Sequence, residues 1–364
     1  MKSRVILGLL ILCLGLVACR KNDEFGDNTQ VALVIPNGTL PQPNIPADNP
    51  LTEERIELGR KLFFDPLLSS DQTVSCATCH IQNDAFSDPN RFSTGVGGAQ
   101  GDRQGMAIFN MAWNDDFFWD GRATTLREQA VGPIENPLEM NESLPNVVAK
   151  LTADSDYPAM FAAAFGDANV TADRIGLAME NFMFSIVSSD SKYDRFLAGN
   201  ATLTASEERG RQLFFGGGPG GGGPGGGPGG NVGGGANCVR CHGGPNFDNR
   251  QFFNIGLDND ANISDVGRQA VTGNPNDRGK FKTVSLRNIA VSGPYMHDGR
   301  FNSLEQVLNF YNNGIQNSAT LDPGLQNAAQ NGMGLSQQDR ADIIAFLNTL
   351  TDNTYLNNPA FSAP

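Results

Sequence analysis

The stretches Cys76–His80, CATCH, and Cys238–His242, CVRCH, share the pattern Cys-x-x-Cys-His. Residues i and i+3 lie on one face of a helical turn, so both thiols of each stretch can bond the same porphyrin. The histidine that follows can supply an axial ligand to the iron. Each stretch is therefore the attachment sequence of a c-type haem, and the sequence predicts two covalently bound haem c groups and redox chemistry.

Two other kinds of site also use paired cysteines. The pairs of a zinc ribbon lie roughly 15–20 residues apart, whereas these two pairs lie in opposite halves of the chain. Neither a zinc ribbon nor a thioredoxin-type dithiol explains a histidine directly after both pairs. The predicted haem-binding residues are Cys76, Cys79, His80, Cys238, Cys241 and His242.

Size and charge limit the possible partners. The chain has 364 residues, enough for two domains with cores of their own. Its net charge of −13 argues against nucleic acid as a partner. The same charge would steer a basic electron-transfer protein toward the surface.

The amino terminus resembles the leader of an exported lipoprotein. Residues 5–17 form an apolar run too short to span a bilayer, and residues 16–19, LVAC, resemble a lipobox. We expect 1–18 to be a signal peptide, Cys19 to carry lipid, and 19–50 to be a tether. A plain signal peptide cut nearby is the alternative. Both predict export, and the lipobox predicts a lipid anchor to a membrane of the cell envelope, facing the periplasm.

A repeat divides the chain. Gly59–Phe64, GRKLFF, precedes the first haem motif, and Gly210–Phe215, GRQLFF, precedes the second. Each is typical of a capped helix whose apolar end packs near its haem. We predict a mainly α fold of two tandem cytochrome c-like domains, 51–199 and 200–352. The Gly/Pro-rich stretch 216–235 is predicted to be a flexible insertion in the second domain.

Counting histidines indicates catalysis. The sequence holds only three, and His297 alone lies outside the two motifs. Both irons therefore cannot have two imidazole ligands. An iron with an open position can bind peroxide or oxygen, whereas six strong ligands favour pure electron transfer.

The stretch after His297 predicts a further helix. Ser303 and Gln306 have the spacing of a capping box, and the apolar periodicity that follows directs Tyr311 inward. Tyr311 is then either an iron ligand or an ordinary buried aromatic residue. Helical spacing also recurs over 173–187 and 339–350.

Five further stretches together resemble the bacterial dihaem cytochrome c peroxidase family, including the branch typified by the methylamine-utilisation enzyme MauG. With the two haem motifs, they run in the family's order from about residue 51 to 350. The stretches are 62–66 (LFFDP), 118–123 (FWDGRA), 132–140 (GPIENPLEM), 285–288 (SLRN) and 294–299 (PYMHDG).

The resemblance implies roles for three residues. In such proteins the first haem is the peroxide site, and the second receives electrons from a reduced small cytochrome c or cupredoxin. Trp119 would bridge the haems, Glu139 would be the distal acid and base, and Pro133 would be the apolar neighbour over the open iron face. Core packing for Trp119 and a solvated carboxylate for Glu139 are the alternatives.

Two departures from the family pattern matter. Residues 92–97 lack the distal histidine of members that need reductive activation, which implies an open first iron in the oxidised protein. Tyr311 stands where a methionine often binds the second iron, as in the MauG branch. A phenolate is a hard anionic donor, so it should lower the potential. Met296 is the rival ligand, and His297 is expected near the second haem without binding its iron.

The resemblance also implies a calcium ion between the domains, at Gln104 with Ser292 and Pro294 as backbone donors, although Gln104 replaces the usual asparagine. Relatives often form homodimers. Three functions stay open: a peroxidase that reduces hydrogen peroxide, a MauG-like oxidase acting on a protein or small molecule, and a non-catalytic dihaem electron-transfer protein.

Overall fold

The computed structural model describes residues 30–216 and 236–364. Within them, helices dominate, and one antiparallel sheet pairs β1 (Phe252–Phe253) with β2 (Phe281–Lys282). The predicted mainly α fold is confirmed. The predicted signal peptide, the lipidation of Cys19 and nearly all of the Gly/Pro-rich insertion lie outside the described residues. In the described part of the chain, no helix has both the length and the apolar character needed to cross a membrane.

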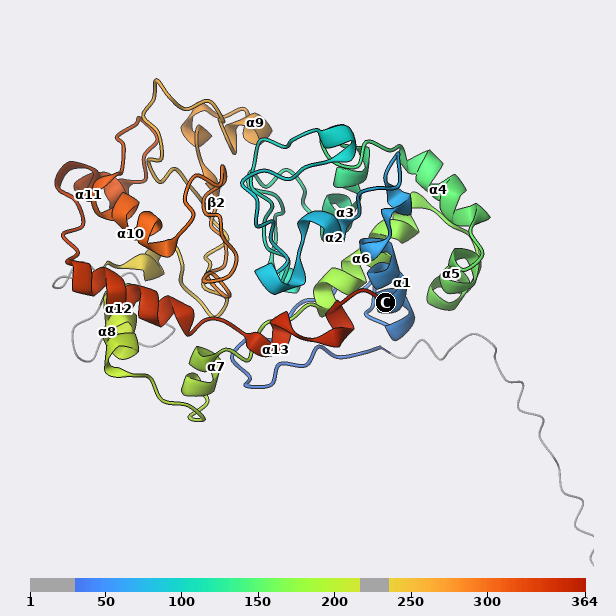
Figure 1. Cartoon of the computed structure of the whole chain (residues 1–364), viewed down its shortest axis with the longest axis horizontal. Helices are drawn as coiled ribbons and strands as arrows, with labels where there is room; N and C mark the ends of the chain where they lie inside the picture. Colours follow the sequence, from blue (N-terminus) through green and yellow to red (C-terminus); the bar gives the residue numbers. More distant parts are fainter. Residues whose placement is uncertain (1–29, 217–235) are drawn as a thin grey trace, which may run out of the picture.

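Figure 1 shows two lobes, with α1–α6 in one and α8–α12 in the other. In the first half of the chain the helices are α1 (Glu53–Phe64), α2 (Cys76–Cys79), α3 (Leu126–Glu135), α4 (Leu144–Ala153), α5 (Tyr157–Phe165), α6 (Ala172–Ser185) and α7 (Lys192–Leu197). In the second half they are α8 (Ala205–Phe215), α9 (Gln269–Thr272), α10 (Leu304–Asn313), α11 (Gln326–Asn331), α12 (Gln337–Asn348) and α13 (Asn353–Leu356).

The repeated glycine allows two equivalent helix crossings. A Cβ atom added at Gly59 on α1 would clash with the carbonyl oxygen of Ala178 on α6. One added at Gly210 on α8 would clash with the carbonyl oxygen of Asp342 on α12. The backbones of each pair can touch because glycine has no side chain. Both crossings carry an apolar helix end toward a haem motif.

The helix caps follow the sequence closely. Thr52 caps α1 and Thr204 caps α8, each by accepting a backbone N–H of the first turn. At α10, Ser303 accepts from the backbone N–H of Gln306, as predicted. The side chain of Gln306, however, accepts from the N–H of Asn302 at 2.7 Å. In the predicted capping box, Gln306 would instead accept from the N–H of Ser303, so the acceptor bond of Gln306 is shifted by one residue.

The apolar cores do not follow the predicted domain limits at two places. Tyr193 on α7, placed in the first domain by the predicted boundary at 199, packs in the core of the second lobe. Tyr355, Leu356 and Phe361, beyond residue 352, pack in the core of the first lobe. The chain therefore returns to the first lobe at its carboxyl end (Figure 1).

Residues 30–50 lie along the folded body. Asn49 is fully buried and donates to the Glu180 carboxylate at 2.7 Å. Asn37 donates to the Asp190 carboxylate at 2.8 Å. The prediction of a tether is wrong for these residues, because their polar side chains find partners on the body.

Candidate haem sites

Each haem motif occupies a single helical turn. Cys76 to Cys79 form α2, and Cys238 opens a short 3-10 turn that ends just before Cys241. Within the described residues, none of these four cysteines forms a disulfide. Burial raises the pKa of Cys76 and Cys238 to about 12 and that of Cys79 and Cys241 to about 11. Two free thiols on one turn meet the requirement for thioether attachment.

Both motif histidines have one ring nitrogen held by the backbone. Nδ1 of His80 lies 2.8 Å from the carbonyl oxygen of Phe86. Nδ1 of His242 lies 3.2 Å from the carbonyl oxygen of Val284 and 3.3 Å from that of Phe247. A histidine that donates through Nδ1 keeps the Nε2 lone pair free for a metal. Burial lowers the pKa of both rings, which favours the neutral form that binds iron.

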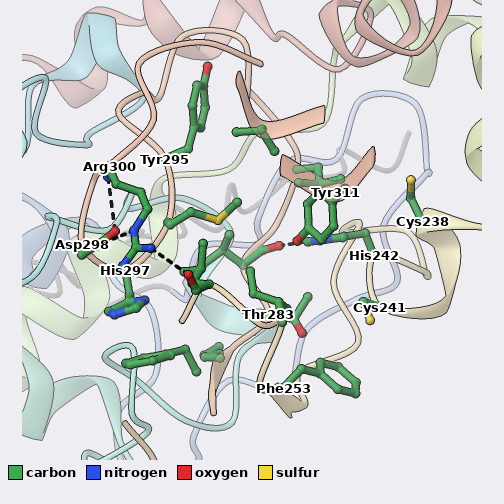
Figure 2. A pocket seen from close by; sticks show the side chains of 18 of the residues that line it. Cys238, Cys241, His242, Phe253, Thr283, Tyr295, His297, Asp298, Arg300 and Tyr311 are labelled. Atoms are coloured by element: carbon green, nitrogen blue, oxygen red, sulfur yellow. Dashed lines mark hydrogen bonds and ion pairs between the residues drawn. The ribbon is translucent and has the colours of Figure 1, made fainter. Parts of the chain in front are cut away.

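A cavity of about 820 Å³ adjoins the second motif. Cys238, Cys241, His242 and Tyr311 all lie on its wall, as Figure 2 shows. Its volume is typical of cofactor sites, which run from about 300 to 1,000 Å³. Apolar side chains of the wall include Leu286, Ile289, Leu304, Val307 and Leu308. The residues present therefore fit a covalently attached haem.

The cavity brings together both candidate axial ligands of the second iron. Tyr311 on α10 and Met296 line it and share one apolar cluster. Burial raises the pKa of the Tyr311 phenol. The assignment of Tyr311 as ligand stays a prediction.

Trp119 also lies on the wall of this cavity. Its indole N–H donates to the carbonyl oxygen of Gln104 at 2.8 Å, and its own carbonyl accepts from the N–H of Lys282 at 2.8 Å. The ring is 6.5 Å from that of His297, centre to centre. Trp119 is thus fixed from both lobes, between the first lobe and the second haem cavity.

His297 lies on the wall of the second haem cavity. It is 8% exposed and stacks on Phe281 with ring centres 3.6 Å apart. Burial lowers its pKa to about 4, so the ring is neutral at physiological pH. Its carbonyl accepts from the N–H of Gln104 at 2.8 Å. These contacts place it near the cofactor site and give it a packing partner.

Glu139 is held by the loop over 92–97. Its carbonyl accepts from the N–H of Val96 at 2.8 Å, and a Cβ atom at Gly95 would clash with that carbonyl. One carboxylate oxygen, Oε1, accepts from the Asn136 side chain at 2.7 Å. Burial raises the pKa of the carboxyl. A carboxyl with a raised pKa suits proton transfer near neutral pH.

Pro133 lies inside α3 and belongs to the same region as Glu139. Proline has no N–H, so the helix loses the bond to the carbonyl of Gln129. The Pro133 carbonyl in turn accepts from the N–H of Met140 at 3.2 Å. This bond connects the helix end to the stretch that carries Glu139, whereas Trp119 lies with Gln104 and His297.

The three predicted calcium positions, Gln104, Ser292 and Pro294, all line the cavity. The side-chain amide of Gln104 donates to Ser87 Oγ at 2.9 Å and to the Asp88 carbonyl at 3.1 Å. Among the described residues, no group of three or more His, Cys, Asp or Glu side chains could hold a metal ion. The Gln104 amide is therefore already hydrogen-bonded, and calcium stays a prediction.

Sequence reasoning missed the backbone partners of the histidines. The carbonyls that hold His80 and His242 include those of Phe86 and Phe247, which both have a φ of 54°. The signal was present, since a phenylalanine follows each motif histidine at nearly the same distance.

These features define a mainly α protein with two c-type haem sites, and comparison with known proteins agrees. Residues 53–202 match the family model described as di-haem cytochrome c peroxidase. The chain is 36% identical over 309 residues to the methylamine utilization protein MauG of Methylorubrum extorquens, covering 84% of this chain and 80% of that protein. It is 34% identical over 310 residues to the cytochrome c551 peroxidase of Pseudomonas aeruginosa, covering 83% and 80%.

A solved structure shows the same fold. The crystal structure of a MauG-like protein associated with microbial copper homeostasis matches with a TM-score of 0.79 and 35% identity, covering 90% of this chain and 97% of that one. The chain belongs to the family of di-haem cytochrome c peroxidases and MauG proteins. The predicted resemblance is confirmed, and with it c-type haem and oxidoreductase chemistry.

Proposed function

We propose that this protein is a dihaem peroxidase that reduces hydrogen peroxide to water with electrons from a small cytochrome c or a cupredoxin. The observation that carries the proposal is the environment of Glu139, a partly buried carboxyl with a raised pKa, fixed by the loop over 92–97. Several relatives are named as cytochrome c peroxidases, which supports the same activity.

The two haems would be held by different residues for different tasks. Cys76, Cys79 and His80 would hold the first, and Cys238, Cys241 and His242 the second. When bound, the haems supply peroxide binding and electron storage, which the protein alone cannot provide. With no distal histidine in residues 92–97, the chain offers no imidazole to close the first iron.

Glu139 would move the proton. Asn136 donates to Oε1, so Oε2 is the oxygen that would take a proton from the peroxide and return it to the departing oxygen. The raised pKa lies closer to neutral pH than that of an exposed carboxyl, which suits a group that both takes and returns a proton. Pro133 would restrict the space beside it without competing as a donor, since it has no N–H.

Trp119 would connect the two haem sites. Two hydrogen bonds, one from the Trp119 indole to the Gln104 carbonyl and one from the Lys282 N–H to the Trp119 carbonyl, fix the residue between the lobes. A ring held in one orientation suits electron transfer, because the electronic coupling between two centres depends on their separation and relative orientation. His297 would support the same wall through its contact with the Trp119 ring.

A MauG-like oxidase is the second candidate. The observation that favours it is Tyr311 on the wall of the second cavity, because an anionic ligand would hold that iron at low potential. Such a protein would act on a protein or small-molecule substrate in place of taking electrons from a cytochrome. The similarity to MauG supports this candidate as well.

We also propose export and a lipid anchor at Cys19, which would place the protein in the periplasm at a membrane. The support is the sequence of residues 1–19 alone. A calcium ion at Gln104 and a homodimer are further proposals, each testable by metal analysis or by light scattering of the holoprotein.

One set of measurements separates the candidates. A high-spin EPR signal from one ferric haem, with rapid peroxide consumption in the presence of reduced cytochrome c, supports the peroxidase. A long-lived state two electrons more oxidised than the resting protein, which reduced cytochrome quenches only slowly, supports the oxidase. Two low-spin, six-coordinate haems would contradict both and indicate an electron carrier.

A further inference from the structure

The carboxyl-terminal segment 353–364, here called the C-terminal strap, leaves the second lobe and packs on the first (Figure 1). Its Tyr355 is 2% exposed. We propose that the strap is a positioning element for His80, the predicted iron ligand of the first haem. The proposal rests on haem binding by His80, which is part of the proposed function, and does not depend on peroxidase activity.

A continuous path of hydrogen bonds joins the strap to His80. The Tyr355 hydroxyl donates to the carbonyl oxygen of Ile108 at 3.2 Å. The N–H of Ile108 donates to the carbonyl oxygen of Phe86 at 3.2 Å, and Nδ1 of His80 lies 2.8 Å from that same oxygen. Tyr355, Ile108 and Phe86 are all buried. The Phe86 carbonyl oxygen, which orients the His80 imidazole, is therefore held by Ile108, and Ile108 is held in turn by Tyr355.

Aromatic packing follows the same path. The Phe86 ring lies 5.9 Å from that of Phe63 and 6.0 Å from that of Tyr355, centre to centre. Phe63 in turn lies 6.4 Å from the His80 ring. The strap therefore packs against Phe86, the residue whose carbonyl holds His80, and α1 packs against Phe86 as well.

A second contact ties the strap to the turn that follows His80. The side-chain amide of Gln82 donates to the Asn358 carbonyl at 2.9 Å and to the Tyr355 carbonyl at 3.3 Å. The Gln82 side-chain oxygen accepts from the Ser362 hydroxyl at 3.0 Å. Gln82 opens the short turn between His80 and Phe86, so the strap contacts both the start and the end of the ligand loop.

Both ends of the strap are anchored. Before it, the buried Asp352 accepts from the N–H of Ser189 at 2.9 Å, and its own N–H donates to Asn288 at 2.8 Å. Near its end, Arg60 on α1 donates to the Ser362 carbonyl at 2.7 Å. The strap is therefore a fixed connection from the second lobe to the ligand loop of the first haem.

The bond from a ligating histidine to its carbonyl partner sets the basicity and orientation of the ring. These in turn tune the reduction potential of the iron. Among described residues, the carbonyls that hold His242 belong to Phe247 and Val284, neither of which lies on the strap. The second haem is consequently an internal reference within the same molecule.

The test is Tyr355→Phe in the full-length holoprotein, which removes only the hydroxyl. Spectroelectrochemical titration with EPR would give the potential of each haem. We expect the carbonyl to hold His80 less firmly, so that the first iron becomes easier to reduce and the second is unchanged. The expected rise in the ratio of reduced to oxidised first haem at fixed potential is about two- to ten-fold, where ten-fold equals about 59 mV for one electron.

Tyr157→Phe is the matched control. Tyr157 is buried in the same core, and its hydroxyl donates to the Asp65 carboxylate at 2.6 Å, away from the ligand loop. It should leave both potentials unchanged. Gln82→Ala removes the side-chain hydrogen bonds between Gln82 and the strap. It should shift the potential of the first haem in the same direction as Tyr355→Phe, and it serves as the test if Tyr355→Phe does not fold.

Unchanged titration of the first haem in Tyr355→Phe and Gln82→Ala would overturn the proposal. Equal shifts in both haems, or the same shift in Tyr157→Phe, would also overturn it, since they would indicate general loosening. Mass spectrometry of the unaltered protein separates this from the proposed function. A chain without haem on Cys76 and Cys79 would refute haem binding itself.

Discussion

Arg287 and Asp194 form a buried ion pair with two hydrogen bonds, at 2.7 Å and 2.8 Å, in which the two side chains are 2% and 1% exposed. Asp194 lies on α7, whereas Arg287 belongs to the stretch 285–288 of the second lobe. Arg287 also donates to the carbonyl oxygen of Pro245 at 2.8 Å, three residues after His242. The pair therefore connects α7 to the loop behind the second haem motif.

Asp194→Asn should unfold the second lobe at lower denaturant concentration. The change leaves the buried Arg287 without its counter-charge, which typically costs about 3–5 kcal/mol. Urea unfolding followed by circular dichroism and by haem absorbance measures the loss. Asp115→Asn is the control, because the Arg250–Asp115 pair is largely exposed and such pairs contribute less than about 1 kcal/mol. Equal losses in the two variants would contradict the assignment.

The same pair predicts an acid limit to stability. Burial alone would raise the pKa of Asp194, but the bonds and charge of Arg287, together with the hydrogen bonds from Ser191 and Thr39, lower it on balance. A lowered pKa gives stability that is complete above the unfolded value of 3.8 and is lost as pH falls through the folded one. We expect Asp194→Asn to lose this part of the acid dependence. Unfolding free energies measured between neutral and acid pH check it, and an unaltered slope would refute the linkage.

Glu139→Gln should cripple peroxide turnover and leave haem content intact. Proton transfer by a positioned side chain typically contributes about 10²–10⁴-fold, so kcat should fall by about 10²-fold or more. Glu135→Gln is the control, since Glu135 is exposed at the end of α3. The measurement is the steady-state rate of peroxide reduction with reduced cytochrome c. An unaltered rate in Glu139→Gln would exclude Glu139 from the reaction.

Asn136→Ala should move the acid limb of the pH–rate profile to higher pH. The Asn136 amide bonds the Glu139 carboxylate and lowers its pKa, against the larger effect of burial. Without it, the pKa rises further, and the fraction of ionised Glu139 falls at any given acid pH. The measurement is kcat/KM against pH. A limb that stays in place or moves to lower pH would show that another group controls it.

Gly59→Ala should destabilise the first lobe. Its Cβ atom would meet the backbone carbonyl of Ala178, and overpacking typically costs about 1–3 kcal/mol. Gly101→Ala is the control, because a Cβ atom there would have only one neighbour, the Arg103 carbonyl at 3.9 Å. Thermal unfolding of the two variants compares them directly. Similar unfolding midpoints for the two variants would mean that α1 and α6 can move apart without loss of stability.

Sequence could predict the features that repeat or have a fixed spacing. The two haem motifs, the helices that precede them and the caps at Thr52 and Thr204 depend on residues a few positions apart. The clash that makes Gly59 necessary involves Ala178, which no local pattern identifies. Local sequence patterns therefore predicted the helices but not where the helices cross.

The tether predicted over 19–50 fails over residues 30–50 for the same reason. Asn, Pro and Gly are typical of linkers, but Asn49 and Asn37 bond to residues 131 and 153 positions away. Outside the two haem motifs, roles for site residues such as Glu139 and Trp119 could be proposed only because a family motif contains them. The strap has no motif and little periodicity, so its role at His80 appears only in three dimensions.

The strap has a consequence for biosynthesis. A chain grows from its amino end and domains generally form in that order, yet the wall behind His80 includes Tyr355, which is made after the core residues of the second lobe. A product that stops at Asp352 would carry both attachment sequences and still lack that wall. The packing of the first lobe can therefore be completed only after the second lobe has been synthesised.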